Sequence, residues 1–305
     1  MSKILIAGGS GLIGKKTTQD LIAKGHEVIH LSRSPKKSSL IPVYKWDIAT
    51  QYIDPEALKD VDYVINFAGA GIADKRWTVA QKKAIIDSRV NGNQLFQKLI
   101  EEKKLNIKKF ISGAAIGYYG DRGSETLTEE STPGTEGFLA ESCIQWEKSI
   151  NAVKKTGVPV AYVRIGIVLA TDGGALEKMM GPAKFGLGSY FGDGSQIYSW
   201  VHIDDISKIF CWLVETSSSE GVYNGTTSNP VSNKKFVQIM MDVKGGLGIV
   251  APVPKFVLSA MLGEMKAVVM TGSNVLPKKL EEEGFEFQYN ELQHCLADLL
   301  LNKSK

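Results

Sequence analysis

The chain has 305 residues, of which 43% are hydrophobic and 23% charged, and its formal net charge is +3. This length suffices for one large domain, or for a nucleotide-binding domain with a smaller lobe attached. A charge so close to neutral argues against nucleic acid or a membrane as the partner and favours small molecules. Cys143, Cys211 and Cys295 lie far apart, so neither a zinc site nor a disulfide framework is predicted.

Targeting signals are not visible in the sequence. The first residues run directly into a strand-like segment, with no basic region followed by a cleavable apolar stretch. Arg164 interrupts the apolar run 158–170, and no other run reaches the roughly 20 residues that span a bilayer. We therefore expect a cytoplasmic protein.

Apolar runs rich in β-branched residues alternate with segments of helical period, which is typical of βαβ units. After a first strand at 3–7, Leu12, Ile13, Leu21 and Ile22 fall on one helical face, and Gly25 ends that helix. Further strands are predicted at 26–31, 43–46, 61–68, 108–114, 158–167 and 221–226, with helices at 79–103 and 138–156. The expected fold is α/β, a Rossmann-type doubly wound parallel sheet.

A smaller lobe is expected in the C-terminal part, because the alternation weakens from about residue 170. Glycines punctuate this region, and residues 186–194 are predicted to be a mobile loop at the substrate cleft or an ordinary linker. Residues 251–254 are expected to open a helical segment that continues to 292–301. The predicted division is a cofactor domain at 1–169, to which 200–230 return, and a lobe formed by 170–199 and 231–305.

A glycine-rich turn follows the first strand and opens the first helix. The glycines keep the turn tight, let the pyrophosphate approach and allow close helix packing, while the free amides of the helix start face the phosphates. A turn that binds nothing is the alternative. The predicted dinucleotide contacts here are Gly8, Ser10, Gly11, Leu12, Ile13 and Gly14.

The end of the second strand predicts the type of cofactor. An NAD site usually has an acidic residue there to accept from the ribose 2′-OH, but this chain has Ser32 and Arg33. A guanidinium suits a 2′-phosphate, and Lys36 or Lys37 adds to the positive field. We therefore predict NADP, the alternative being that Arg33 is a solvated loop charge.

Several further motifs together resemble the extended short-chain dehydrogenase/reductases, the group that includes nucleotide-sugar epimerases. They are the glycine turn, NFAG at 66–69, Asn91 in the next helix and ISGAAIGYYG at 111–120. More narrowly, the chain resembles an atypical epimerase-like subfamily with its own small C-terminal domain of unknown function. The segments that carry this second resemblance are KRWT at 75–78, SR at 88–89, RIGIVL at 164–169, SWVHI at 199–203, VLPKKL at 275–280 and GFEF at 284–287.

The resemblance implies NADP binding and adds cofactor contacts from Phe67, Ala68, Gly69 and Ile167. Arg76, beside Trp77, is interpreted either as a contact to a cofactor phosphate or an anionic substrate, or as a residue that packs at a helix start.

The usual catalytic pair of that family is missing from this sequence. Active members carry Tyr-x-x-x-Lys on the helix after the fifth strand, where the lysine lowers the tyrosine pKa. Those places fall near Leu139 and Cys143, and none of the ten tyrosines has a lysine four residues later. Tyr118-x-x-x-Arg122 is the nearest imitation, but arginine does not deprotonate and the segment reads as a loop.

Other residues are weighed as sources of a proton. Ala114 stands where the family has a hydroxyl, with Ser112 two residues earlier. Tyr118 and Tyr119 follow the fifth strand, where the substrate pocket begins, and either supply a proton or pack the pocket wall. Glu141 is interpreted as a solvated carboxylate rather than an acid, and His202 as a hydrogen-bonded structural histidine rather than a base.

Two functions remain open at this point. One is an NADP(H)-dependent oxidoreductase or epimerase-like enzyme that acts on a small polar molecule, with an unorthodox acid or none. The other is a non-catalytic NADP(H)-binding sensor or interaction protein, which the loss of the catalytic pair would permit.

Overall fold

A central sheet of eight strands organises the computed structural model, which describes residues 1–35 and 40–301. Its strand order is β13-β8-β6-β5-β1-β2-β3-β4, and all neighbours run parallel except β4, which is antiparallel to β3. The strands are β1 Lys3–Ala7, β2 Glu27–Ser32, β3 Val43–Asp47, β4 Tyr52–Ile53, β5 Tyr63–Asn66, β6 Lys109–Ala115, β8 Val160–Ile165 and β13 Gly221–Gly225. The predicted doubly wound α/β fold is confirmed.

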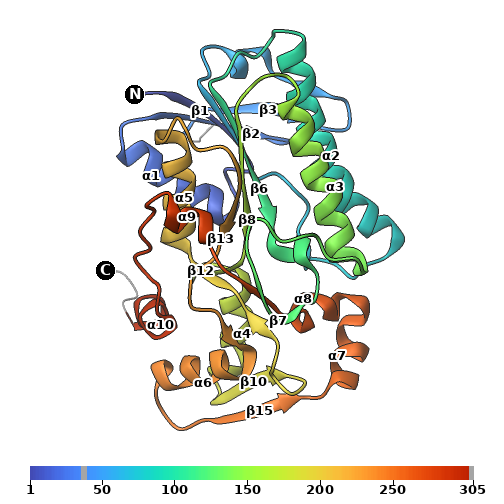
Figure 1. The fold of residues 1–305 in the computed structure, drawn as a ribbon, viewed down its shortest axis with the longest axis vertical. Coiled ribbons are helices and arrows are strands. Elements are labelled where there is room, and N and C mark those ends of the chain that lie inside the picture. Colours follow the sequence, from blue (N-terminus) through green and yellow to red (C-terminus); the bar gives the residue numbers. More distant parts are fainter. Residues whose placement is uncertain (36–39, 302–305) are drawn as a thin grey trace.

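Two layers of helices cover the sheet, one on each face (Figure 1). Helices α1 (Leu12–Ala23) and α5 (Ile203–Glu215) pack together on one face, and α2 (Val79–Glu101) and α3 (Gly137–Lys154) on the other. Because both faces of β1 are covered, Ile4, Leu5 and Ile6 are fully buried and contribute to two separate apolar cores.

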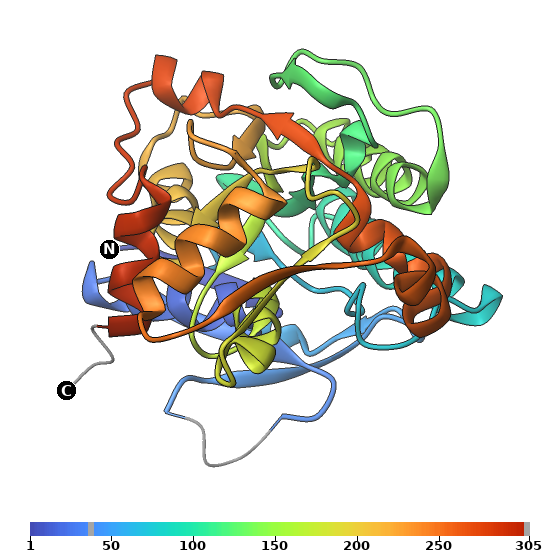
Figure 2. The same cartoon turned by 90° about the horizontal axis from the view of Figure 1, so that it is seen from below.

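A further group of elements forms a third apolar core, centred on Trp200 and Phe236. Helices α6 and α10 lie side by side there, as Figures 1 and 2 show, and β10 pairs in parallel with β15. The elements of this part are α4 Gly174–Ala183, β10 Leu187–Phe191, α6 Asn233–Lys244, β15 Ile249–Val253 and α10 Leu292–Leu301. The helices α7 Lys255–Leu262 and α8 Ala267–Met270 follow β15 in the chain and contribute no residue to this core.

Three two-stranded pairs connect these elements with the loops of the sheet. They are β7 (Gly123–Leu127) with β16 (Ser273–Val275), β9 (Ile167–Leu169) with β12 (Trp200–His202), and β11 (Ile197–Tyr198) with β14 (Val231–Ser232). The remaining short helices are η1 Pro55–Leu58, η2 Ile116–Tyr119, η3 Gly263–Lys266 and α9 Lys278–Glu282. Within the described ranges, no helix combines the length and the apolar character that a membrane span requires.

Three sequence expectations need correction. The predicted strand 158–167 breaks at Gly166, where a Cβ would lie 2.5 Å from the Ser199 carbonyl oxygen, so β8 ends and β9 begins. The predicted mobile loop 186–194 contains strand β10, which β15 pairs and fixes. Residues 251–254 do not open a helix, since β15 extends to Val253 and α7 begins at Lys255.

The strand order reverses between β1 and β5, because the chain proceeds from β1 to β2 and β3 on one side and from β5 to β6 and β8 on the other. Loops that leave the carboxyl ends of β1 and β5 therefore diverge and leave a crevice. In doubly wound sheets this crevice is the place where ligands bind.

Candidate functional site

Two neighbouring cavities open at the carboxyl edge of the sheet. The first, of about 600 Å³, lies between the loops that follow β1, β2 and β5, and the second, of about 200 Å³, between α2, α3 and the segment that carries α8 and β16. Helix α2 separates them, since Ala84 and Ser88 line the first cavity while Ile85 and Arg89 line the second. A ligand that fills the first cavity therefore ends close to the second.

The glycine turn after β1 forms one wall of the first cavity, through Gly8, Ser10 and Gly11. Gly8 has φ +82°, and a Cβ on Gly14 would lie 2.4 Å from the Gly8 carbonyl oxygen, so the turn admits no side chain at either position. The Gly11 amide donates to the Gly8 oxygen at 3.0 Å, and no side chain caps the start of α1. The first-turn amides of α1 are thus free to bind an anion.

Ser32, Arg33 and Ser34 line the other end of the first cavity. The Ser34 amide donates to the Ser32 hydroxyl oxygen at 3.2 Å, which fixes the turn at the end of β2. The Arg33 side chain is exposed, and no carboxylate of the described chain pairs with it. Lys36 and Lys37, which were expected to add positive charge here, lie outside the described residues.

The loop after β5 forms the third wall, through Phe67, Ala68 and Gly69. Its shape is held by a buried chain of amides, in which Asn66 Nδ2 donates to Asn93 Oδ1 at 2.8 Å and Asn93 Nδ2 donates to Ser149 Oγ at 2.9 Å. Asn66 Oδ1 in turn accepts from the Ala68 amide at 3.0 Å. The α2 residue that makes this contact is Asn93, which lies two residues beyond the Asn91 singled out in the sequence.

Some predicted cofactor contacts do not line the first cavity. Leu12, Ile13 and Gly14 lie in the first turn of α1 and are not among the residues that line it, so their cofactor contacts stay predictions. Ile167 lines the second cavity instead. Arg76 donates to the carbonyl oxygens of α7 residues at 3.0 and 3.4 Å and lines neither cavity, so its cofactor contact stays a prediction.

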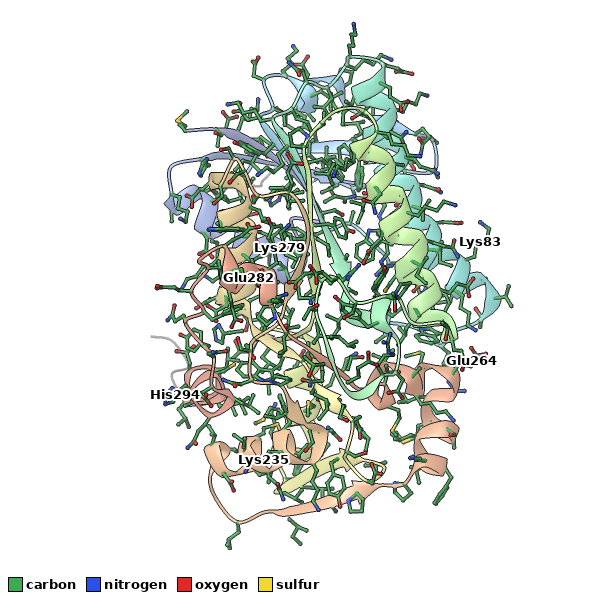
Figure 3. The ribbon with its side chains drawn as sticks, in the orientation of Figure 1. Lys83, Lys235, Glu264, Lys279, Glu282 and His294 are labelled. Carbon is green, nitrogen blue, oxygen red and sulfur yellow. The ribbon has the colours of Figure 1, made fainter. Side chains whose placement is uncertain are left out.

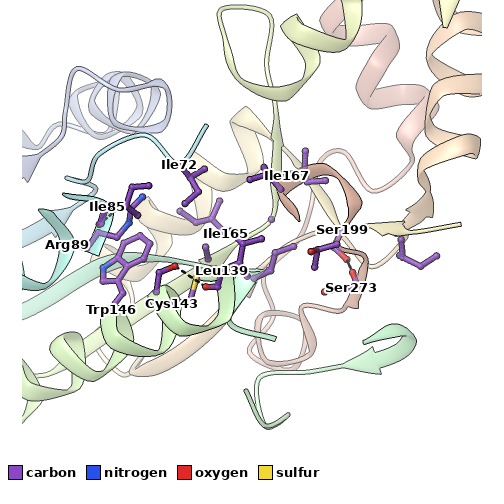
Figure 4. Close-up of a pocket in the computed structure, with 18 residues that line it drawn as sticks. Ile72, Ile85, Arg89, Leu139, Cys143, Trp146, Ile165, Ile167, Ser199 and Ser273 are labelled. Carbon is purple, nitrogen blue, oxygen red and sulfur yellow. Dashed lines mark hydrogen bonds between the residues drawn. The ribbon is translucent and has the colours of Figure 1, made fainter. Parts of the chain in front are cut away.

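Helix α3 presents Leu139, Cys143 and Trp146 to the second cavity (Figure 4). Leu139 and Cys143 are the residues that the family resemblance aligned with the catalytic tyrosine and lysine. The Leu139 side chain has no proton to donate, and burial raises the pKa of the Cys143 thiol to about 12. At neutral pH this wall therefore holds neither a phenol nor a cation nor a thiolate.

Arg89 of α2 lines the same cavity and lies next to Trp146 (Figure 4). Its Nη1 donates to the Ile85 carbonyl oxygen at 2.9 Å, and its guanidinium carbon lies 4.8 Å from the centre of the Trp146 ring. Burial lowers the pKa of this guanidinium. The structure thus provides one cation at the junction of the two cavities.

The tyrosines and the serine considered as proton donors line neither cavity. The Tyr119 hydroxyl is buried, donates toward Asn224 Oδ1 at 2.7 Å and accepts from Arg164 Nη1 at 2.8 Å. The Tyr118 ring stacks on the Arg164 guanidinium, 3.6 Å from its carbon. Ser112 is buried in β6 and donates to the Gly113 carbonyl oxygen. Their catalytic roles stay predictions, and this geometry weighs against them.

His202 and Glu141, the other residues considered as sources of a proton, lie outside both cavities. His202 Nδ1 accepts from the Asp204 amide at 3.0 Å and caps α5, and its buried ring stacks on Tyr289. This agrees with the interpretation of a hydrogen-bonded structural histidine. The Glu141 side chain is exposed on α3 and lines neither of the two cavities.

Sequence reasoning did not assign a site role to Arg89. A signal was present, because Ile85, Arg89, Gly92 and Phe96 recur at the spacing of one helix face, and Ile85, Gly92 and Phe96 are buried. An arginine on an otherwise buried face needs a partner. The walls at Trp46 and Ile48 were also missed, because β3 carries no motif.

A doubly wound sheet, an open glycine turn at its switch point and a second cavity alongside define a Rossmann-type nucleotide-binding protein. The chain belongs to the NAD dependent epimerase/dehydratase family, whose model matches residues 4–224. The model of a domain of unknown function, DUF1731, matches residues 253–299. The predicted family resemblance, including its C-terminal domain of unknown function, is confirmed.

Similar proteins span nearly the whole chain. The epimerase family protein YfhF of Bacillus subtilis is 35% identical over 98% of each chain. A chloroplastic SDR39U1 homolog of Arabidopsis thaliana is 34% identical over 97% of this chain and 86% of its own length. The crystal structure of the human epimerase family protein SDR39U1 with NADPH has a TM-score of 0.87 and 28% identity, over 98% of this chain and 99% of the human chain.

Proposed function

We propose that the protein binds NADP(H) in the first cavity and acts, as an epimerase-like oxidoreductase, on a small polar molecule in the second. The observation that carries this proposal is the arrangement of the two cavities on either side of α2, with the open glycine turn at one end of the first. The NADPH named with the human relative adds support.

The walls of the first cavity suit the parts of this cofactor. The uncapped amides at the start of α1 would hold the pyrophosphate, and the missing side chains of Gly8 and Gly14 leave room for its approach. Arg33, which has no acidic partner in the described chain, would pair with the 2′-phosphate through charge-assisted hydrogen bonds. An acidic residue here would instead select NAD.

The bound nicotinamide would supply or accept a hydride at the carbon of a substrate carbonyl or alcohol. The chain's own contribution in the second cavity is to exclude water with Ile72, Ile165 and Leu139 and to hold the substrate beside Arg89. Since Leu139 carries no ionisable proton and burial makes the Cys143 thiol a weaker acid, the proton on the substrate oxygen would come from solvent or from the substrate itself.

We also propose that residues 1–169 with 200–230 bind the cofactor, while 170–199 and 231–305 complete the substrate side. Val268, Thr271 and Ser273 support this division, because they come from the C-terminal part and line the second cavity.

Turnover tests this proposal. Purified protein is incubated with NADPH and a panel of carbonyl compounds and nucleotide sugars, and loss of reduced cofactor and epimerised product are measured. Oxidation of NADPH or epimerisation of at least one compound is expected.

A second function is favoured by one observation, namely that the wall formed by Leu139 and Cys143 lacks the usual acid and cation. Tight NADPH binding without turnover of any compound in the panel would assign the protein to the class of non-catalytic NADP(H) sensors.

A further inference from the structure

Arg89 carries a charge that no acidic group of the described residues balances. Of the five arginines of the chain, Arg33 and Arg76 are exposed, while Arg122 pairs with Glu125 and Arg164 with Glu147. Arg89 is only partly accessible, yet its bonds in the described structure are one to a carbonyl oxygen of its own helix and one ring contact. A half-buried guanidinium is costly without an anion, so this arrangement points to an anionic ligand.

The cavity around Arg89 is otherwise apolar and uncharged. Its side chains include Ile72, Ile85, Leu139, Trp146, Ile165 and Ile167, and Arg89 is the only ionic side chain among the residues that line it. The hydroxyls of Ser142, Ser199 and Ser273 already donate to backbone carbonyl oxygens at 2.9, 2.6 and 2.7 Å. A ligand here therefore meets one cation and a hydrocarbon wall.

The guanidinium is fixed at the boundary with the first cavity. A Cβ on Gly69 would lie 3.0 Å from the guanidinium carbon, so the loop after β5 packs directly on Arg89. Gly69 itself lines the first cavity. An anion bound to Arg89 would thus place its neighbouring carbon close to the cofactor end of the second cavity.

We infer that the second cavity binds a small organic monoanion, whose carboxylate pairs with Arg89 and whose hydrocarbon body packs on the isoleucines, Leu139 and Trp146. This names the substrate class of the proposed oxidoreductase, and so rests on that function: a keto acid or hydroxy acid, whose carboxylate end is polar and whose side chain is apolar. A nucleoside diphosphate sugar carries two phosphates and a polar sugar. The cavity offers only one cation for the phosphates and few free hydrogen-bond donors for the sugar.

Calorimetry with the full chain saturated with NADPH tests this inference. The probes are hydrocinnamate and isocaproate, their uncharged amides, and UDP-glucose. Each carboxylate is expected to bind roughly tenfold or more tightly than its amide, because the amide forms no charge-assisted pair with the guanidinium. UDP-glucose is expected to bind more weakly than either carboxylate.

Variants of α2 assign the preference to Arg89. Arg89→Gln is expected to remove the preference for the carboxylates and to leave NADPH affinity within about threefold of the original. Arg89→Lys, which keeps the charge, should retain part of the preference for the carboxylates. Lys83→Gln is the matched control, because Lys83 lies on the same helix, points to solvent (Figure 3) and pairs with Asp87, so its loss removes the same charge without touching the cavity.

The inference is overturned if acids and amides bind equally, if no carboxylate binds, or if Arg89→Gln keeps the preference. A fall in NADPH affinity of Arg89→Gln with the carboxylate preference intact would assign Arg89 to the cofactor instead. If Arg89→Gln does not fold, Leu139→Trp replaces it: filling the cavity must abolish carboxylate binding and spare NADPH. Failure of the original chain to bind NADPH would contradict the proposed function, whereas the carboxylate preference is also measurable without cofactor.

Discussion

Arg164 and Glu147 form a bidentate ion pair beneath α3, with Nε to Oε1 at 2.7 Å and Nη2 to Oε2 at 2.8 Å. Their side chains are 4% and 6% exposed. The third nitrogen of Arg164 donates to the Tyr119 hydroxyl, which bonds Asn224. A charged residue in the apolar strand β8 is thus explained by a buried polar network that joins β8, α3, η2 and β13.

Breaking this ion pair should destabilise the fold strongly. Arg164→Met leaves the Glu147 carboxylate buried without its partner, which costs about 3–5 kcal/mol of unfolding free energy. The double variant Arg164→Met/Glu147→Leu should recover a large part of that loss, because neither charge remains. Urea unfolding of the two variants and the original chain measures both effects. A loss below about 1 kcal/mol in Arg164→Met would contradict this account.

The variant Tyr119→Phe tests whether the Tyr119 hydroxyl stabilises the fold or acts as the catalytic acid. Burial raises the pKa of the Tyr119 hydroxyl to about 12, and its partners are Arg164, Asn224 and the Thr128 carbonyl oxygen, so its removal should cost about 1–3 kcal/mol of stability. NADPH affinity and any turnover should not change, since the hydroxyl lines neither cavity. Unchanged stability together with a large loss of turnover would instead make Tyr119 the acid.

Gly14→Ala should damage the cofactor turn. Its Cβ would lie 2.4 Å from the Gly8 carbonyl oxygen, so α1 must move away from β1, at a cost of about 1–3 kcal/mol and with weaker NADPH binding. Gly181→Ala in α4 is the control, because nothing lies within 4 Å of the added Cβ and alanine favours the helix. Calorimetry and urea unfolding report the two effects, and equal behaviour of both variants would refute the packing argument.

Stability should fall on acidification because of a half-buried histidine, His30. His30 Nε2 lies 2.8 Å from Thr18 Oγ1, and burial lowers the pKa of its ring from the ordinary 6.5. Below that value the unfolded chain binds a proton that the folded chain does not, so unfolding free energy decreases as pH falls through it toward the lower folded pKa. His30→Gln should flatten the dependence measured between about pH 7 and pH 5. An unchanged slope would exclude His30 as its source.

Arg33→Asp should discriminate between the two nicotinamide cofactors. Loss of its charge-assisted bonds to the 2′-phosphate removes about 1.5–3 kcal/mol from NADPH binding, which is roughly a tenfold to hundredfold loss. NADH, which lacks that phosphate, should bind with little change. Lys59→Asp makes the same charge reversal outside both cavities and should alter neither affinity. Equal losses for NADPH and NADH in Arg33→Asp would refute the assignment to NADP.

Local patterns predicted the parts of the fold that depend on neighbours in sequence. The strands around β1 and the helices α2 and α3 follow from apolar periodicity, and the positive φ of Gly25 confirms the predicted end of α1. Strand β10 was missed because its five residues include a glycine and their pairing with β15 comes from a segment some sixty residues later. Periodicity carries no information about that partner.

The candidate site also contains residues that the sequence predicted and residues that it did not. The glycine turn and Arg33 were predicted because tight turns and strand ends leave a motif in sequence. The contact between Asn93 and Asn66 was not predicted, because only the packing of α2 decides which of its amides reaches Asn66. Arg89 was missed because the sequence does not show which side chains lie next to it. Its neighbours in the described structure come from α2, from α3 and from the loop after β5.

Calorimetric titration of the purified chain with NADPH and, separately, with NADH tests the central claim most directly. Saturable binding of NADPH at one site, tighter than that of NADH, is the predicted result, because the open amides of α1 act together with Arg33, with which no carboxylate of the described residues pairs, on the phosphorylated cofactor. Absence of heat and of binding for both nucleotides would contradict the account.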